Sequence, residues 1–171
     1  YNIDLFGSVK SSRFAAFEGK KAYKNNLLQT ENNTVLSVKT AFYNVLRAQR
    51  YLKVQQETTD QLKAHLKDAQ INFEAGTIPK YEVLRAETQV ANAKQALISS
   101  SNGVSMAKAA FNSALGRPVD TQFDLVEPES GTYPSFDLQK CLDSAVKFRP
   151  EILSLESMAI VGDQYVTIAK N

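Results

Sequence analysis

The strongest constraint in this sequence is a repeat of apolar and small residues that runs through two long segments and is interrupted once, at residues 75–80. Before the interruption, spacings of four and three alternate along Ala41, Val45, Ala48, Leu52, Gln55, Thr59, Leu62, Leu66, Ala69 and Phe73. After it, a seven-residue spacing joins Val83, Val90, Leu97, Val104 and Phe111, with Ala86, Ala93, Ser100, Ala107 and Ala114 between them. A repeat of 3.5 residues keeps one side of a helix against a partner helix. The sequence therefore predicts an all-α fold, a long antiparallel coiled-coil-like α-hairpin with a short turn.

Composition restricts the classes of protein to which the chain can belong. Charged residues make up 22% and apolar residues 43% of the 171 residues, which is typical of a folded domain. The net charge of +2 provides no global basic field for nucleic acid. The single cysteine, Cys141, excludes an internal disulfide, and no run in the sequence approaches the roughly 18 apolar residues of a membrane helix. The chain begins in mid-pattern without a methionine, so we interpret it as part of a longer polypeptide.

The hairpin is predicted to occupy residues 9–116, after the end of a β-strand at residues 1–8. Residues 1–5 alternate apolar and polar side chains, and this pattern stops at Gly7. A helix is expected from Ser11 or Ser12, either of which can act as N-cap, to Glu74. Gly76 is expected to close it in the left-handed conformation. Thr77 is then expected to cap the second helix, with Pro79 in its first turn.

Shorter elements are predicted after the hairpin. Residues 117–135 contain three of the five prolines and form a connector. Asp137 is placed to cap a helix at residues 138–148, the Arg149-Pro150 pair interrupts it, and a further helix is expected from Ile152 to Lys170 within the segment 136–171.

The first arm of the hairpin is longer than the second, and it is apolar on a second side as well. Residues 14–36 have no partner of full length, so they pack on the terminal helices, on a neighbouring subunit, or on both. The second apolar side consists of Tyr23, Leu27, Leu28, Leu36, Val38, Phe42, Tyr43 and Leu46. This wide surface favours side-by-side assembly of several hairpins over a solitary one.

The sequence does not predict a catalytic, metal or cofactor site. His65 is the only histidine, and its neighbours along the chain are Lys63, Ala64, Leu66 and Lys67. The chain has no GxGxxG, GxxxxGK[ST], CxxC or HExxH motif. We therefore expect a protein that is not an enzyme.

Four stretches resemble the TolC-type outer-membrane efflux proteins. They are IDLFG at residues 3–7, TAFYNVL at 40–46, FEAGTIPKYEVL at 73–84, and the pair formed by LG at 115–116 and RPE at 149–151. The resemblance implies the periplasmic part of one of two tandem repeats: the end of a barrel strand, a long hairpin, and equatorial helices in residues 136–171. It also implies a homotrimer in the outer membrane, held there by barrel strands that this chain lacks. Such a duct needs no cofactor and binds no nucleic acid.

The resemblance also implies a partner for the turn. In this family the hairpin tip meets a periplasmic adaptor protein, which connects the duct to an inner-membrane pump. The adaptor contact would then involve Phe73, Ala75, Gly76, Thr77, Ile78 and Pro79. The family's Val-Gly-Leu tip is here Ala75-Gly76-Thr77, so only the glycine is kept and the tip is less apolar.

Two other classes of protein carry long α-hairpins. In a periplasmic adaptor, the hairpin is inserted into a glycine-rich β domain, and flanks of that kind do not occur here. An unrelated coiled-coil spacer or scaffold leaves the strand pattern at residues 1–7 and the Arg149-Pro150 break unexplained.

Overall fold

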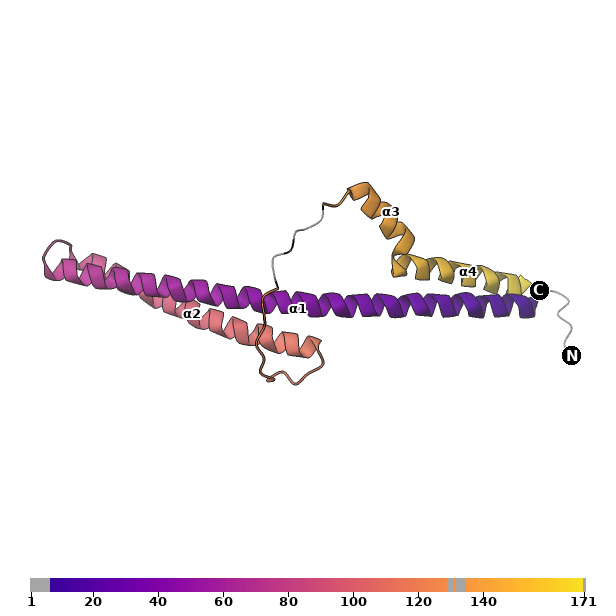
Figure 1. Ribbon diagram of the computed structural model, residues 1–171, viewed down its shortest axis with the longest axis horizontal. Helices are drawn as coiled ribbons and strands as arrows, with labels where there is room; N and C mark the ends of the chain where they lie inside the picture. The colour runs from indigo at the N-terminus through magenta and orange to yellow at the C-terminus, as the bar shows by residue number, and fades with distance from the viewer. Residues whose placement is uncertain (1–6, 129–130, 132–134, 171) are drawn as a thin grey trace. The chain divides into compact units, whose positions relative to one another are not determined.

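Four helices follow one another in the computed structural model, which describes residues 7–128, 131 and 135–170. They are α1 (Ser8–Glu74), α2 (Lys80–Ala114), α3 (Leu138–Phe148) and α4 (Pro150–Lys170) (Figure 1). The described residues contain no β-strand, so the all-α prediction is confirmed, while residues 1–6 of the predicted strand lie outside the described range. The chain divides into two compact units, residues 36–128 and residues 1–35 with 129–171, so α1 contributes to both.

The predicted seam holds the first unit, residues 36–128, together. On α1 the stripe buries Val45, Thr59 and Ala69, and on α2 it buries Val83, Ala86, Val90, Ala93, Ser100 and Phe111. Small side chains at alternate positions allow the two backbones to approach closely, while valine and phenylalanine fill the space between them. Burial of this stripe, at about 25 cal/mol per Å² of apolar surface, is what stabilises the hairpin.

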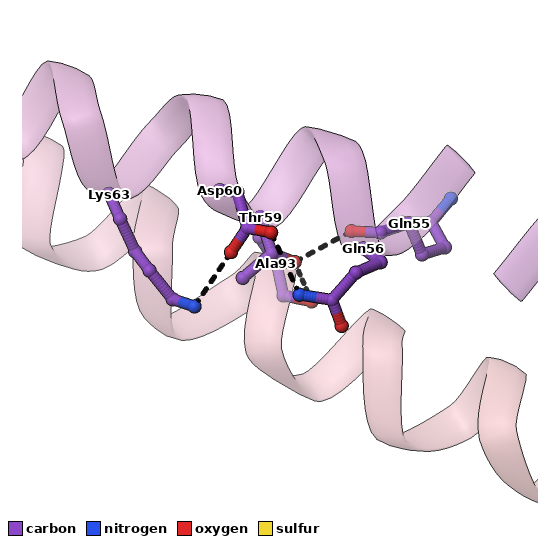
Figure 2. Close-up of polar contacts among 6 residues, drawn as sticks. All are labelled: Gln55, Gln56, Thr59, Asp60, Lys63 and Ala93. Atoms are coloured by element: carbon purple, nitrogen blue, oxygen red, sulfur yellow. Dashed lines mark hydrogen bonds and ion pairs between the residues drawn. The ribbon is translucent and has the colours of Figure 1, made fainter. Parts of the chain in front are cut away.

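Thr59 introduces a polar group into the middle of this seam. Its side chain is fully buried, and its hydroxyl lies 2.7 Å from the carbonyl oxygen of Gln55 and 3.4 Å from that of Ala93 on α2 (Figure 2). Since a hydroxyl has one hydrogen, the shorter bond within α1 dominates, and the bond across the seam is the weaker branch. The hydroxyl is therefore satisfied, and the seam accepts a polar residue without an orphaned donor.

Next to Thr59, Asp60 faces solvent. Its carboxylate accepts hydrogen bonds from the Gln56 amide at 3.0 Å and from the Lys63 ammonium at 2.9 Å (Figure 2). These bonds, the one from Gln56 above all, lower the pKa of Asp60 from its usual value. Asp60 therefore stays ionised at lower pH than an isolated aspartate.

In the second unit, residues 1–35 with 129–171, α4 packs along the first part of α1 (Figure 1). Ser11, Ala15, Glu18 and Ala22 are the buried positions of α1 there, and α4 buries Pro150, Ser154 and Ser157. The Ser154 hydroxyl donates to the Ala22 carbonyl at 3.3 Å. This packing confirms the first alternative for the unpaired part of the first arm, because as far as Ala22 it lies against a terminal helix.

The beginning of α1 differs from the prediction. The helix starts at Ser8, because the amide of Ser11 already donates to the Gly7 carbonyl at 2.9 Å. The Ser12 hydroxyl bonds back to the Ser8 carbonyl at 2.8 Å. The expectation that Ser11 or Ser12 is the N-cap was therefore wrong: both lie inside the helix, and the Ser12 hydroxyl bonds to the preceding turn instead.

The break between α3 and α4 follows the predicted chemistry. The carboxylate of Asp137 caps α3 by accepting from the Lys140 amide at 3.0 Å, as expected. Arg149 is extended, which the following proline favours. Pro150 is itself the first residue of α4, two residues before the predicted start at Ile152, because an amide at this position needs no partner inside the helix.

The second apolar side of α1 is narrower than predicted. Leu46 is buried, and the Phe42 ring lies 6.2 Å from the ring of Phe111, which in turn lies 5.2 Å from that of Phe123. The connector supplies Phe123, a contact that the helical repeat could not reveal. Tyr23, Leu27, Leu28, Leu36 and Tyr43 are exposed as predicted, and Val38 is partly covered.

Asn112 fastens the start of the connector to the end of α2. Its side chain is fully buried, and its amide donates to the carbonyls of Val119 at 3.1 Å and Thr121 at 2.9 Å. Further along, Glu127 forms a two-bond ion pair with Arg50 of α1, at 3.0 and 2.9 Å. The connector is thus held to the hairpin at two places.

We expect Asn112→Ala to lower the free energy of unfolding by about 1–3 kcal/mol, because two hydrogen bonds to carbonyls are lost at a buried site. Urea denaturation measures the change. The exposed Asn102 on α2 provides the control, and Asn102→Ala should leave stability within about 0.5 kcal/mol. Equal effects of the two substitutions would show that Asn112 does not fasten the connector.

The hydrogen bonds and charge of Arg50 lower the pKa of Glu127 from the ordinary value of 4.5. A lowered folded-state pKa means that the pair contributes stability above the unfolded pKa and loses it as pH falls through the folded one. A carbon-13 NMR titration of the Glu127 carboxyl should therefore show a midpoint below 4.5, and Arg50→Gln should move it up toward 4.5. A midpoint that Arg50→Gln leaves in place would contradict the ion pair.

Candidate functional site: the hairpin tip

The turn between α1 and α2 is closed by backbone hydrogen bonds. The amide of Gly76 donates to the Phe73 carbonyl at 2.9 Å, and the amide of Thr77 donates to the Asn72 carbonyl at 2.9 Å. These two bonds form a Schellman motif, which requires a left-handed residue after the helix. Gly76 has φ of 74°, so the prediction for its conformation is confirmed.

Thr77 does not cap α2 as predicted. Its hydroxyl donates to the Asn72 carbonyl at 2.8 Å, so the side chain reinforces the end of α1 instead. The N-cap position of α2 is occupied by Pro79, which makes no side-chain cap and whose carbonyl accepts from the Glu82 amide at 3.1 Å. The Thr77 prediction was wrong because Thr77 lies three residues before Lys80, the first residue of α2.

The six predicted contact residues divide into two groups. Ile78 is partly buried and packs against the core of Ala69, Val83 and Ala86. The other five are exposed: Phe73, Ala75, Gly76, Thr77 and Pro79. Phe73, the last member of the seam, is 40% exposed and presents the largest apolar side chain of this group. The structure therefore brings five of the six residues together on one accessible tip and assigns Ile78 an anchoring position beneath it.

Sequence reasoning missed Asn72. Its carbonyl accepts both the amide and the hydroxyl of Thr77, so it joins the two sides of the turn. The position of Asn72, four residues before Gly76, could have indicated this role, because the residue at that position accepts the longer bond of a Schellman motif.

The space around Gly76 is open. A Cβ built at this position would meet no atom within 4 Å, so the glycine is required by its backbone conformation and not by crowding. The absence of a side chain leaves the backbone at the tip accessible to another molecule.

Charges around the tip are balanced. Residues 61–87 contain four basic residues and four acidic ones: Lys63, Lys67, Lys80 and Arg85, and Asp68, Glu74, Glu82 and Glu87. The Tyr81 hydroxyl bonds to the Glu82 carboxylate, which raises the pKa of Tyr81, and the guanidinium of Arg85 lies 4.0 Å from the same carboxylate. Because these charges balance, the surroundings of the tip do not favour a strongly charged ligand.

The tip offers contact surface but no reactive groups. In the part of the chain that the structure describes, no three His, Cys, Asp or Glu residues lie close enough to hold a metal ion. At the five exposed contact residues, the accessible groups are backbone, one hydroxyl that already has a partner, and apolar side chains. This arrangement suits the binding of another protein.

Comparison with known proteins identifies the family. A family model described as outer membrane efflux protein matches residues 1–117, about two thirds of the chain. The chain belongs to the outer membrane efflux protein family. No curated protein matches the sequence.

Membership connects the hairpin with transport. The family is one of outer-membrane efflux proteins, so membership favours an efflux component over the adaptor and spacer alternatives. Its members are transport proteins and not enzymes. It associates the protein with the outer membrane and the periplasm, whereas no helix among the described residues is long and apolar enough to span a bilayer.

Gly76→Ala should destabilise the hairpin by about 1–2 kcal/mol, because alanine is strained at positive φ. Gly116, at the other end of α2, has φ of 68° and the same pair of hydrogen bonds, from its own amide and that of Arg117. Gly116→Ala should therefore cost a similar amount, which thermal unfolding can compare. A stable Gly76→Ala variant would show that the left-handed turn is not required.

Proposed function

We propose that this chain forms part of the periplasmic wall of a trimeric outer-membrane duct. Its hairpin tip docks a periplasmic adaptor and, through the adaptor, an inner-membrane pump. The observation that carries the proposal is the locally closed tip of a two-helix hairpin with accessible backbone at Gly76. Family membership supports the efflux role, and the proposal adds the partner and the position of contact.

A groove along the hairpin supports assembly into a wall. Between α1 and α2 lies a groove of about 940 Å³, with small residues that include Ala41, Ala48, Gly103 and Ala107. The exposed apolar side chains of Leu36, Tyr51 and Met106 also line it. A monomer rarely leaves such a surface uncovered, and small residues allow another helix to approach closely. The groove is thus suited to a neighbouring hairpin in the trimer.

Adaptor docking can be tested with a photo-crosslinking amino acid at Thr77 in the full-length protein, expressed together with its adaptor and pump. We expect a covalent product with the adaptor, identified by mass spectrometry. The control position is Ser105, which is also exposed and lies on α2 well away from the turn. Crosslinking of equal yield at both positions, or at Ser105 alone, would contradict docking through the tip.

A pair of glycine variants separates docking from folding. We expect Gly76→Val to reduce the crosslink from Thr77 at least severalfold, because a branched side chain both strains the turn and covers the backbone. Gly116→Val strains a turn with the same geometry and should leave the crosslink unchanged. Equal loss in both variants would mean that global stability, and not contact at the tip, controls the yield.

A further inference from the structure

The first four turns of α1 carry two different faces. One face, Ser11, Ala15, Glu18 and Ala22, is buried in the packing with α4. Arg13, Phe17, Lys20 and Lys24 repeat the same four-three-four spacing two residues later and are all exposed. Because two residues turn a helix by about 200°, this second set lies on a different side of α1 from the buried face, although Arg13 and Phe17 share a cavity with Gln164 of α4. Phe14 and Lys21 flank it, and we call these six residues the basic-aromatic face.

The positive charge of this face is local. Residues 8–24 contain five Lys or Arg and a single acid, Glu18. The Glu18 side chain is buried, and its carboxylate lies 3.5 Å from the Lys21 ammonium. α4 carries Glu151, Glu156 and Asp163, and it packs on the buried face of α1, where Ser154 bonds to Ala22. Residues 61–87, in contrast, have four charges of each sign. The charge is therefore a feature of the first turns of α1 and not of the hairpin as a whole.

Aromatic side chains stand exposed among these cations. Phe14 and Phe17 are 45% and 63% exposed. Together with Arg13 of α1 and Gln164 of α4 they line a cavity of about 650 Å³. Exposed phenylalanine beside Lys and Arg is the combination by which helices bind at the boundary between lipid headgroups and acyl chains. The charge complements anionic headgroups, and the rings can enter the layer beneath them.

We propose that the basic-aromatic face of α1 binds the headgroup layer of a membrane containing anionic phospholipid. Two observations carry this inference: the local cluster of cations and the exposed phenylalanines that they surround. Family membership supplies a membrane near the protein, but the inference does not depend on adaptor docking at the tip. It gives the periplasmic part of the chain a lipid contact of its own.

The chain contains no tryptophan, so one substitution creates a clean fluorescent reporter. We expect Phe17→Trp to show a blue shift on addition of vesicles of phosphatidylcholine with 30% phosphatidylglycerol. Vesicles of phosphatidylcholine alone should give little shift, and added salt should reverse the binding. Tyr81→Trp is the matched control, because Tyr81 is 62% exposed, nearly the same as Phe17, and lies in the balanced segment.

Neutralising two of the cations tests the electrostatic contribution to membrane binding. A Lys or Arg at an anionic surface contributes about fivefold to affinity, so Arg13→Gln with Lys20→Gln should weaken vesicle binding about 30-fold. Lys67→Gln with Lys80→Gln removes the same charge from exposed positions in the balanced segment and should change binding less than twofold. Circular dichroism verifies that each variant remains helical.

The outcomes distinguish the alternatives. A shift at residue 17 alone, dependent on anionic lipid and on Arg13 and Lys20, supports the inference. No shift at either position, equal shifts at residues 17 and 81, or equal binding to neutral vesicles would overturn it. Because every variant tested here leaves residues 73–79 unchanged, failure of this inference is separate from failure of adaptor docking.

Discussion

Close packing between two helices of regular repeat is the constraint on which the hairpin depends. Alanine and serine alternate with valine, leucine and phenylalanine along α2, so that α1 can lie close to it at the buried positions between Val83 and Ser100 and again at Phe111. This packing fixes the register of the two arms, and the register determines which residues form the turn. Gly76 stands at the tip because the stripes on both sides of it are in register, while Ile78 anchors the turn to the last core layer.

Helix positions could be predicted because they follow from local pattern. The four-three repeat places the seam, and Asp137 and the Arg149-Pro150 pair place the ends of the shorter helices. The ends that depend on competing side-chain bonds could not be fixed this way. Ser11, Ser12 and Thr77 are all good capping residues, but none of them caps its predicted helix. Ser11 and Ser12 lie inside α1, and the hydroxyls of Ser12 and Thr77 bond to backbone carbonyls of α1.

Contacts between residues far apart in the sequence account for the other differences between the predicted and the observed structure. Leu46 and Phe42 belong to the apolar surface of α1 in any helical projection, but Phe111 packs against Phe42, and the connector residue Phe123 packs against Phe111. The sequence pattern does not reveal where an irregular connector returns, so the role of Asn112 was also invisible. For the tip, the six residues came from resemblance to a family, and the structure added that Ile78 points inward and that Asn72 closes the turn.

α1 and α2 each end in a turn that is closed by backbone hydrogen bonds, at Gly76 and Gly116 respectively. The hydrogen bonds of each turn are local, so neither turn depends on how many residues separate it from the other. The reach of the hairpin can therefore change in evolution by adding or deleting one heptad in each arm, a step of about 10 Å, while the chemistry of both turns stays the same. The length of the hairpin and the conformation of its tip are then independent, so the hairpin can become longer or shorter in evolution while the turn at its tip stays the same.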